Sequence, residues 1–437
     1  MEWWLTLILI LGSLFVLMLT GYPVVFVFLT ITFALYSILM GGIPGIRAYI
    51  ISINASLDSF TLVAIPMFVL MGEALFQSGI AMRAIDAVEK MLGKVPGRLG
   101  ILAAGTGVLF GAVSGSMSAN TAMLGGILTP EMQKRGYDNR MIFGPIMGGG
   151  SLAMLIPPSS LAILFASIAE ISAGKVLMAG TLPGVLLGIL YAAYIVISCK
   201  IKPSLAPAYE VHKFTLKEIL KSLLLDIFPL FIIIFIVIGS ILLGLCTPTE
   251  AAALGAVGTI FLCIYNKTFG WKLIKTVAFN TFRSTVMILS IMAACAGFGA
   301  MLSYTGVITK LATFAISANL SITGIVLLMG LVVLILGTFM DSTPLMMIII
   351  PIFYPIINKL GIDPIWFATF MLISIKIGNY SPPYGMLLFV MKGISPPGTK
   401  TTDIYRSVMP FNILDCFLLL LLVAFPSLAL ILPNLAK

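Results

Sequence analysis

Long apolar runs separated by short polar stretches make up most of this 437-residue chain. About 20 helical residues, each rising 1.5 Å, cross the hydrocarbon core of a membrane. Residues 3–19 have roughly the length of a secretory signal, but no basic residue precedes them and a second apolar run follows almost at once. We therefore interpret them as a retained first helix. Together the runs predict spanning helices at residues 3–19, 24–40, 62–76, 176–198, 227–245 and 411–432.

Two other apolar regions are split by polar residues. One break lies at residues 114–121 in the first half of the chain, and another lies at residues 341–344 in the second half. Each pattern predicts a helical hairpin that enters the membrane and returns on the same side, with the polar break at its tip. The two hairpins are predicted at residues 99–128 and 322–354.

The apolar run that follows each hairpin is divided as well. Residues 142–166 contain Gly148-Gly-Gly150 and Pro157-Pro158, and residues 366–390 contain Pro382-Pro383. Proline removes a helix hydrogen bond, so we expect two transmembrane helices that are unwound in the middle. Non-helical backbone persists at membrane depth only where protein or water satisfies it. Paired breaks of this kind are typical of the binding site of a secondary transporter.

Landmarks in the two halves recur at a constant spacing. Pro23 and Pro248 are 225 positions apart (248 minus 23), and so are Pro157 and Pro382 (382 minus 157). A half built from an odd number of crossings runs the other way in its duplicate, which gives the inverted repeat of many carriers. We predict a first repeat at residues 1–200, a connecting loop at 201–221 and a second repeat at 222–437.

The composition places the chain in a membrane rather than in water. Hydrophobic residues make up 60% of the sequence and charged residues 9%, a balance that would leave a water-soluble protein with an insoluble surface. The net charge is +9, but the basic residues are scattered between apolar runs, which argues against nucleic acid as a partner. The richest basic segment, residues 200–221, is predicted to be cytoplasmic by the positive-inside rule.

The sequence contains no pattern typical of an enzyme. The five cysteines are widely spaced, and the single histidine, His212, lies in the predicted loop. An intramembrane enzyme needs a nucleophile with a base, or a metal cluster, and neither grouping is found. Gly148-Gly-Gly150 is not followed by the Lys-Ser/Thr of a phosphate-binding loop, so ATP is not the expected energy source. We predict a transporter and not an enzyme.

The first polar break offers oxygen atoms that suit a hard monovalent cation. Neutral oxygens come from Ser114, Ser116, Ser118, Asn120 and Thr121, beside carbonyl groups that a broken helix exposes. Weak, reversible ligation of this kind is typical of Na⁺ sites. Close helix packing by Gly and Ser is the alternative explanation of this segment.

The second polar break contains Asp341, an acid within an apolar region. A carboxylate is costly at membrane depth and is retained mainly where a positive charge meets it, although satisfaction by neighbouring donors is the alternative. Helix N-termini at the hairpin tips carry partial positive charge, which predicts an anionic solute in the same region. The sequence leaves the roles of Glu73, Glu170 and Glu250 open.

A short amphipathic helix is predicted at residues 82–92, where apolar residues recur at helical spacing opposite charged ones. Such a helix lies on the membrane surface. It is either an arm that links a moving block to a fixed scaffold or a solvated connector.

Four motifs together resemble a known family. They are Ile65-Pro-Met-Phe-Val-Leu-Met-Gly-Glu-Ala74, Ser114-Gly-Ser116, Leu155-Ile-Pro-Pro158 and Thr247-Pro-Thr-Glu-Ala-Ala252. Over almost its whole length the chain resembles the large membrane (M) subunit of tripartite ATP-independent periplasmic (TRAP) transporters. The resemblance implies an all-α polytopic membrane protein of the elevator-type ion-transporter superfamily, with an inverted repeat, two re-entrant hairpins and two unwound helices.

The resemblance also implies Na⁺-coupled uptake of an organic acid anion, such as sialic acid or a C4-dicarboxylate, across the bacterial inner membrane. A periplasmic substrate-binding (P) protein would deliver the substrate, and a separate small membrane (Q) subunit would complete the transporter. Na⁺ is the implied cofactor, and the partners include membrane lipid but no nucleic acid. The alternatives are a stand-alone dicarboxylate-type Na⁺ symporter without a binding protein, and an ion channel.

Two Na⁺ sites follow from the resemblance by position. The first joins residues 114–121 to 149–157, and the second joins 337–343 to 378–382. Some family members have an acid near the position of Asn120, which leaves the Na⁺ stoichiometry of this chain open. The substrate is expected to contact Ser116, Asn120, Ser159, Asp341, Ser342, Tyr380 and Ser381. The expected Na⁺ ligands are Ser114, Ser116, Ser118, Asn120, Gly149, Pro157, Gly337, Asp341, Thr343, Gly378 and Pro382.

Overall fold

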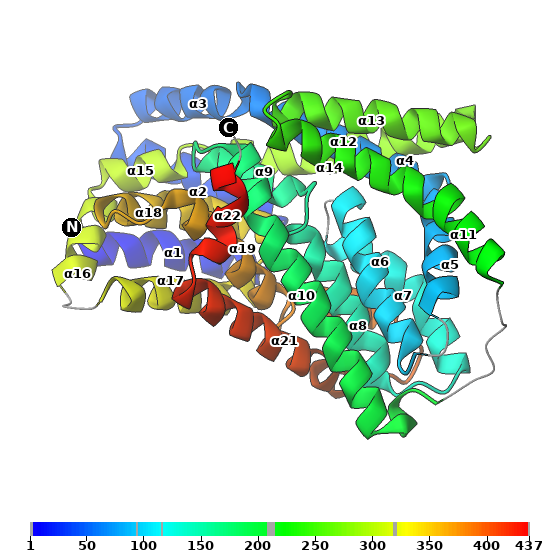
Figure 1. The fold of residues 1–437 in the computed structure, drawn as a ribbon. Coiled ribbons are helices and arrows are strands. Elements are labelled where there is room, and N and C mark those ends of the chain that lie inside the picture. Colours follow the sequence, from blue (N-terminus) through cyan, green and yellow to red (C-terminus); the bar gives the residue numbers. More distant parts are fainter. Residues whose placement is uncertain (1–2, 93–94, 115–116, 208–214, 318–320, 436–437) are drawn as a thin grey trace.

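Helices joined by short turns build this protein, as the computed structural model shows (Figure 1). The structure describes residues 3–92, 95–114, 117–207, 215–317 and 321–435, and no β-strand occurs among them. Seven helical segments in these ranges are long and apolar enough to cross a membrane. The prediction of an all-α membrane protein with several spans is therefore confirmed.

The first half of the chain contributes ten helices within the described ranges. The first two, α1 and α2, begin where the apolar pattern predicts, and Gly21, at a φ of 79°, lies in the turn that joins them. The helices are α1 (Trp3–Leu19), α2 (Val24–Leu39), α3 (Ile43–Leu57), α4 (Ala64–Gln77), α5 (Ile80–Leu92), α6 (Arg98–Ser114), α7 (Met117–Lys134), α8 (Asn139–Ser151), α9 (Ser160–Ile168) and α10 (Ala173–Ile201).

The second half begins with α11, within the predicted connecting loop, of which residues 208–214 lie outside the described ranges. A short π-helical turn joins α11 to α12. The helices are α11 (Leu216–Ser222), α12 (Phe228–Leu242), α13 (Pro248–Tyr265), α14 (Trp271–Cys295), α15 (Phe298–Tyr304), α16 (Val307–Ser317), α17 (Ile322–Gly337), α18 (Ser342–Lys359), α19 (Pro364–Asn379), α20 (Met386–Ile394), α21 (Thr401–Ala424) and α22 (Ser427–Leu435).

The two halves place similar elements in the same order. In each half a pair of helices, α6 with α7 or α17 with α18, precedes a helix that ends before a Pro-Pro pair, and a short helix and a long helix follow. Both Pro157-Pro158 and Pro382-Pro383 have a cis peptide bond. The opposite orientation of the halves and their boundaries at residues 200 and 222 stay predictions.

The halves interleave rather than pack as separate units. Helix α4 of the first half packs on α13 and α14 of the second, and α2 also packs on α14. In the other group of helices, α21 packs on α8, and α10 contacts α19. Each half therefore completes its core with helices from the other, which no local sequence pattern specifies.

Three sequence expectations need correction. The first break is shorter than predicted, because the helix resumes at Met117 and includes Ser118, Asn120 and Thr121. The glycine run 148–150 is helical, so the break in this region follows Ser151 and includes the Pro-Pro pair. The apolar run 411–432 is two helices, since Pro426 lacks the backbone N–H that would continue α21.

Glycine allows close backbone contact between each first hairpin helix and the helix that follows the hairpin. A Cβ atom on Gly107 of α6 would lie 2.4 Å from the carbonyl carbon of Gly149 in α8. In the second half a Cβ atom on Gly337 of α17 would lie 3.0 Å from the Cα atom of Gly378 in α19. Only glycine fits such contacts, so the run 148–150 is a packing surface and not a helix breaker.

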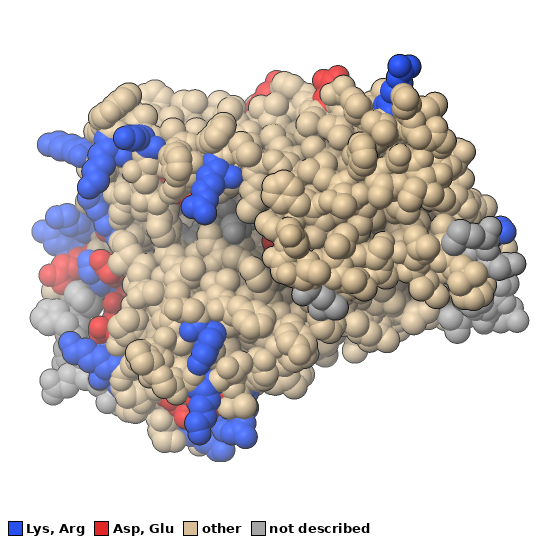
Figure 2. All heavy atoms as spheres, turned by 180° about the vertical axis from the view of Figure 1, so that it is seen from behind, with Lys and Arg blue, Asp and Glu red and all other residues tan. Residues whose placement is uncertain are grey.

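Many charged side chains lie at the end of the molecule that contains α5 and α11. Figure 2 shows that most of the remaining surface on that face is uncharged. The predicted amphipathic helix is α5, which buries Ala84 and Ile85. Its Glu89 accepts ion pairs from Arg98 of α6 at 2.9 Å and from Arg135 at 3.4 Å. This helix is thus tied to the first hairpin.

We predict that Gly107→Ala destabilises the fold, because the added methyl group meets backbone atoms that cannot move aside. Overpacking of this kind typically costs about 1–3 kcal/mol. Gly105→Ala is the matched control, since Gly105 lies in the same helix, is exposed and has no atom within 4 Å of an added Cβ. The apparent melting temperature of the purified protein should fall for Gly107→Ala only, and equal melting temperatures would contradict the close contact.

Candidate functional site

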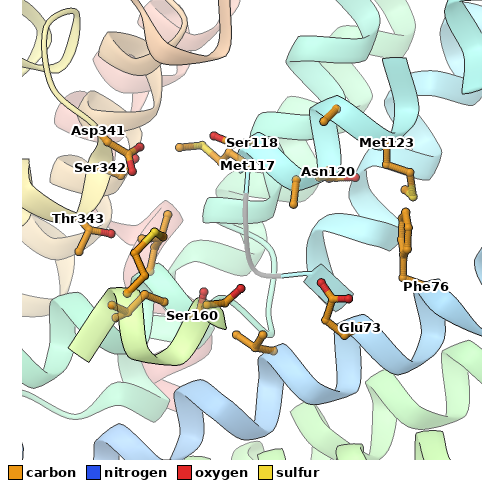
Figure 3. A pocket seen from close by; sticks show the side chains of 18 of the residues that line it. Glu73, Phe76, Met117, Ser118, Asn120, Met123, Ser160, Asp341, Ser342 and Thr343 are labelled. Carbon is orange, nitrogen blue, oxygen red and sulfur yellow. The ribbon is translucent and has the colours of Figure 1, made fainter. Parts of the chain in front are cut away.

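One cavity of about 370 Å³ joins the two hairpin tips. Ser118 and Asn120, at the start of α7, line it together with Asp341, Ser342 and Thr343, at the start of α18. Figure 3 shows these two groups across the cavity from each other, with Glu73 and Phe76 of α4 on a third side. The structure therefore brings together residues from the two polar breaks, which are more than 200 positions apart in the sequence.

The second tip presents a helix N-terminus and a free carboxylate to the cavity. Asp341 is the N-cap residue of α18, with φ −69° and ψ 160°, but its side chain makes no capping hydrogen bond. No ion pair or side-chain hydrogen bond of Asp341 is found within the described part of the chain. The first-turn N–H groups of α18 carry partial positive charge, which stabilises the nearby carboxylate.

In the first half, Asn120 ties the hairpin to the helix that follows. Its Nδ2 atom donates to the carbonyl oxygen of Gly107 at 2.9 Å and to that of Gly150 at 3.2 Å. The neighbouring Thr121 hydroxyl lies so close to Gly150 that an added Cβ would be 2.3 Å away. Asn120 Oδ1 and Thr121 Oγ1 are buried and have no hydrogen-bond partner.

In the second half the amide comes from the helix that follows the hairpin and not from the hairpin itself. Asn379, the last residue of α19, donates through Nδ2 to the hydroxyl of Ser342 on α18. Its Oδ1 atom is buried and has no hydrogen-bond partner. Beside it, Gly378 makes the close backbone contact with Gly337.

These unpaired oxygens fit a cation with a preference for neutral oxygen ligands. A buried acceptor without a donor is costly, and a bound cation would satisfy it. Asn120 Oδ1 and Thr121 Oγ1 are available in the first half and Asn379 Oδ1 in the second. Within the described ranges no group of three or more His, Cys, Asp or Glu residues could hold a transition metal. Neutral oxygen ligands of this kind could hold Na⁺, and the assignment of these residues to Na⁺ stays a prediction.

The charged side chains of the cavity are acidic. Glu73 of α4 accepts from Asn280 Nδ2 at 2.8 Å and from Gln77 Nε2 at 3.3 Å, and it lines the cavity with Asp341. No Lys, Arg or His is among the described residues of the lining. An anion that enters this cavity therefore meets two carboxylates.

Glu250, whose role the sequence left open, belongs to the start of a helix. Its backbone N–H donates to Thr247 Oγ1 at 3.3 Å, and its carboxylate accepts from the Thr247 backbone N–H at 2.8 Å. This is a capping box at the beginning of α13. The spacing in Thr247-Pro-Thr-Glu250 is the sequence signature of a capping box, so the role of Glu250 could have been predicted from the sequence.

The other predicted site residues that the structure describes do not line the cavity. Ser159 caps α9 and is fully buried, where it donates to the Met154 carbonyl. Ser116 and the side chain of Ser114 lie outside the described parts of the chain. The remaining residues contribute to the hairpin contacts or the unwound segments, and their assignment to Na⁺ or substrate stays a prediction: Gly149, Pro157, Gly337, Gly378, Tyr380, Ser381 and Pro382.

Sequence reasoning missed a buried charged cluster. Lys376 of α19 forms an ion pair with Asp415 of α21, and neither side chain has any solvent exposure. The hydroxyl groups of Tyr191 and Tyr380 both donate to the Asp415 carboxylate. Lys376 and Asp415 each interrupt a predicted apolar run. A charged residue within an apolar run is the feature that singled out Asp341, so the same feature could have identified these two residues.

We predict that Asn120→Leu lowers the apparent melting temperature, because it removes two hydrogen bonds inside the helix contact at a cost of about 1–3 kcal/mol. Asp341→Asn should change stability by no more than about 0.5 kcal/mol, since the Asp341 side chain makes no capping hydrogen bond and Asn is about as favourable as Asp at an N-cap. Thermal unfolding of both variants in detergent measures the difference. A large loss for Asp341→Asn would mean that this carboxylate has a structural role.

Comparisons with known proteins agree with this architecture. The Alcanivorax borkumensis YdaH transporter has a similar fold, with a TM-score of 0.62 and 18% identity over 89% of this chain and 90% of that chain. The C4-dicarboxylate TRAP transporter large permease protein DctM of Pseudomonas aeruginosa is 32% identical over 91% of this chain and 92% of its own length.

A second relative is a longer protein. The isethionate TRAP transporter permease protein DctMQ of Oleidesulfovibrio alaskensis is 30% identical over 85% of this chain, which spans 58% of that relative. The family model of the DctM component of tripartite ATP-independent periplasmic transporters matches residues 11–428. The chain therefore belongs to the DctM family, the large membrane component of TRAP transporters.

Proposed function

We propose that this protein couples the uptake of an organic acid anion to a Na⁺ gradient by an elevator-type movement of the two hairpins against a scaffold. The observation that carries the proposal is the single cavity lined by Ser118 and Asn120 of one tip and by Asp341 and Ser342 of the other. A solute bound there contacts both halves at once. Movement of the tips as a block would carry it across.

The charge of the cavity supports a requirement for cations. Glu73 and Asp341 repel an anionic substrate, and no basic side chain among the described lining residues compensates them. Na⁺ bound to the free acceptors of Asn120, Thr121 and Asn379 would reduce this repulsion and order both tips. Each ligand would then raise the affinity for the other, which is the thermodynamic basis of coupling.

The distribution of basic residues supports an orientation. Figures 1 and 2 show that the end of the molecule near α5 and α11 carries many of the Lys and Arg side chains, so the positive-inside rule assigns it to the cytoplasm of a bacterial inner membrane. The cavity lining reaches Gln77 and Ala81, at the junction of α4 and α5. We interpret the structure as the inward-facing arrangement.

Partner proteins are part of the proposal. A periplasmic binding protein would deliver the substrate, and a small membrane subunit would complete the transporter. The DctMQ relative, which extends beyond the matched part, supports such a subunit. Relatives are named for a C4-dicarboxylate, for isethionate and for sialic acid, so an organic acid anion is the proposed substrate class.

The first test is uptake by the protein reconstituted in liposomes with its two partners. An inward Na⁺ gradient should drive accumulation of a labelled organic acid, and replacement of Na⁺ by choline should abolish it. Uptake that is indifferent to Na⁺ would contradict the coupling. Uptake without the binding protein would favour the stand-alone symporter.

Asp341 provides a second test. Asp341→Ala should reduce Na⁺-driven uptake to background, because it removes the carboxylate at the second tip, while the protein stays folded. Ser284→Ala is a suitable control, since Ser284 lines the same cavity from α14 and not from a hairpin. Normal uptake by Asp341→Ala would assign this residue to structure alone.

Glu73 provides a test of the cavity charge. Because α4 packs on α13 and α14, Glu73 would stay with the scaffold and favour substrate release on the cytoplasmic side. Glu73→Gln should tighten substrate binding in the inward-facing arrangement by roughly 1 kcal/mol, or about fivefold. Equilibrium binding of a labelled organic acid measures this change. Ser284→Ala, at an uncharged lining residue of α14, is the control, and unchanged affinity for Glu73→Gln would contradict the prediction.

A further inference from the structure

The cluster around Lys376 and Asp415 joins three helices inside the protein. Lys376 Nζ donates to the Asp415 carboxylate and, at 2.7 Å, to the hydroxyl of Tyr191 on α10. It also approaches the hydroxyl of Tyr380 at 3.4 Å. All four side chains have 0% exposure. The positive and negative charges therefore satisfy each other and two hydroxyl groups in a closed unit without solvent.

Stability alone is a weak reason for such a cluster. Removing two charges from water is costly, and well-packed apolar residues of similar volume often stabilise a protein as well or better. A buried ion pair does impose one geometry, because each charge must stay against its partner. The question is which part of the molecule this geometry positions.

The part that the cluster positions is the end of α19, because Tyr380 is the residue that follows the last helical residue, Asn379. Its hydroxyl is held by Asp415, while its backbone directly follows Asn379. Asn379 contributes the buried, unpaired Oδ1 atom of the second half and contacts Ser342 at the second tip. The next residue, Ser381, donates back to the Ile377 carbonyl at 2.6 Å. Asp415 thus anchors the start of the unwound segment from one side.

The first half uses a different device at the corresponding place. Gly149 faces Gly107 as Gly378 faces Gly337, so the position two residues before each contact is Met147 in the first half and Lys376 in the second. Met147 is buried and uncharged. There the Asn120 amide holds the helices together through backbone carbonyl groups.

We propose that Lys376 and Asp415 are positioning residues for the cation-binding segment of the second half. Lys376 acts as a permanent counter-ion, so that Asp415 can anchor Tyr380 without taking up a Na⁺ ion. The anchored Tyr380 holds Asn379 Oδ1 in place for the transported cation. This inference rests on the proposed Na⁺ coupling and extends it to residues outside the cavity.

Two tyrosines provide a matched pair of variants. Tyr380→Phe and Tyr191→Phe each remove one buried hydroxyl from Asp415, but only Tyr380 is next to Asn379 in the chain. Tyr380→Phe should raise the Na⁺ concentration for half-maximal uptake about tenfold, in line with the loss of a hydrogen bond to a charged group. Tyr191→Phe should leave it within about twofold. Tyr191→Phe should also keep the wild-type half-saturation for substrate when Na⁺ is saturating.

The Na⁺ dependence is measured independently by the melting temperature of the full-length protein in detergent. NaCl is titrated, and choline chloride at the same concentrations is the control. Equal Na⁺ shifts in the two tyrosine variants would overturn this inference while leaving the coupling intact. A wild-type protein that does not respond to Na⁺ in uptake or in stability would overturn the proposed function, and the inference with it. The two failures are therefore distinguishable.

A double variant separates positioning from stability. Lys376→Met with Asp415→Leu removes both charges and leaves no buried charge unpaired, so the protein should fold. Its Na⁺ half-saturation should rise at least as much as that of Tyr380→Phe. A folded double variant with wild-type Na⁺ dependence would show that the pair is only structural and would overturn the inference.

Discussion

The structure depends on one constraint: polar groups released where helices end inside an apolar protein must find partners there. Backbone and amide groups at such a point lose water, and each unsatisfied group costs free energy. Asn120 meets this constraint in the first half by donating to Gly107 and Gly150, and Asn379 meets it in the second by donating to Ser342. The acceptors that remain unpaired, Asn120 Oδ1, Thr121 Oγ1 and Asn379 Oδ1, are the proposed cation ligands.

Close helix contact makes these amide bridges possible. At the Gly107–Gly149 and Gly337–Gly378 contacts there is no room for a side chain between the helices, so short amides reach across to the neighbouring element. The same contacts bring each hairpin tip toward the unwound segment of its own half. Helices α4 and α14, which pack on each other, then line the cavity from outside the hairpins.

The two halves are alike in element order and differ in charge. A neutral amide ties the first hairpin to its neighbouring helix, whereas the second half adds the ion pair of Lys376 and Asp415 behind its unwound segment. The cavity between them has Glu73 and Asp341 as its charged lining residues among those described. Negative charge faces the cavity, and the buried positive charge of Lys376 is neutralised by Asp415 within the protein.

The sequence by itself determined the elements that depend on neighbouring residues. Apolar run length gave the bounds of α1, and the polar residues before Pro344 marked the second tip, because helix continuation and burial are local properties. Four short motifs also indicated the family before any packing was known. Local rules failed at residues 148–150, where glycine serves a helix contact, and at Pro426, where a long apolar run hid a break.

Only the tertiary structure decided which distant residues meet. The partners of Asn120, the pairing of Lys376 with Asp415 and the contact of Tyr191 with both join residues that are 13 to 224 positions apart in the sequence. It also decided that Ser160, and not Ser159, lines the cavity. Glu73 of α4 lines this cavity together with Asp341. The physical reason is that these choices depend on how helices of two interleaved halves pack, which no single segment specifies.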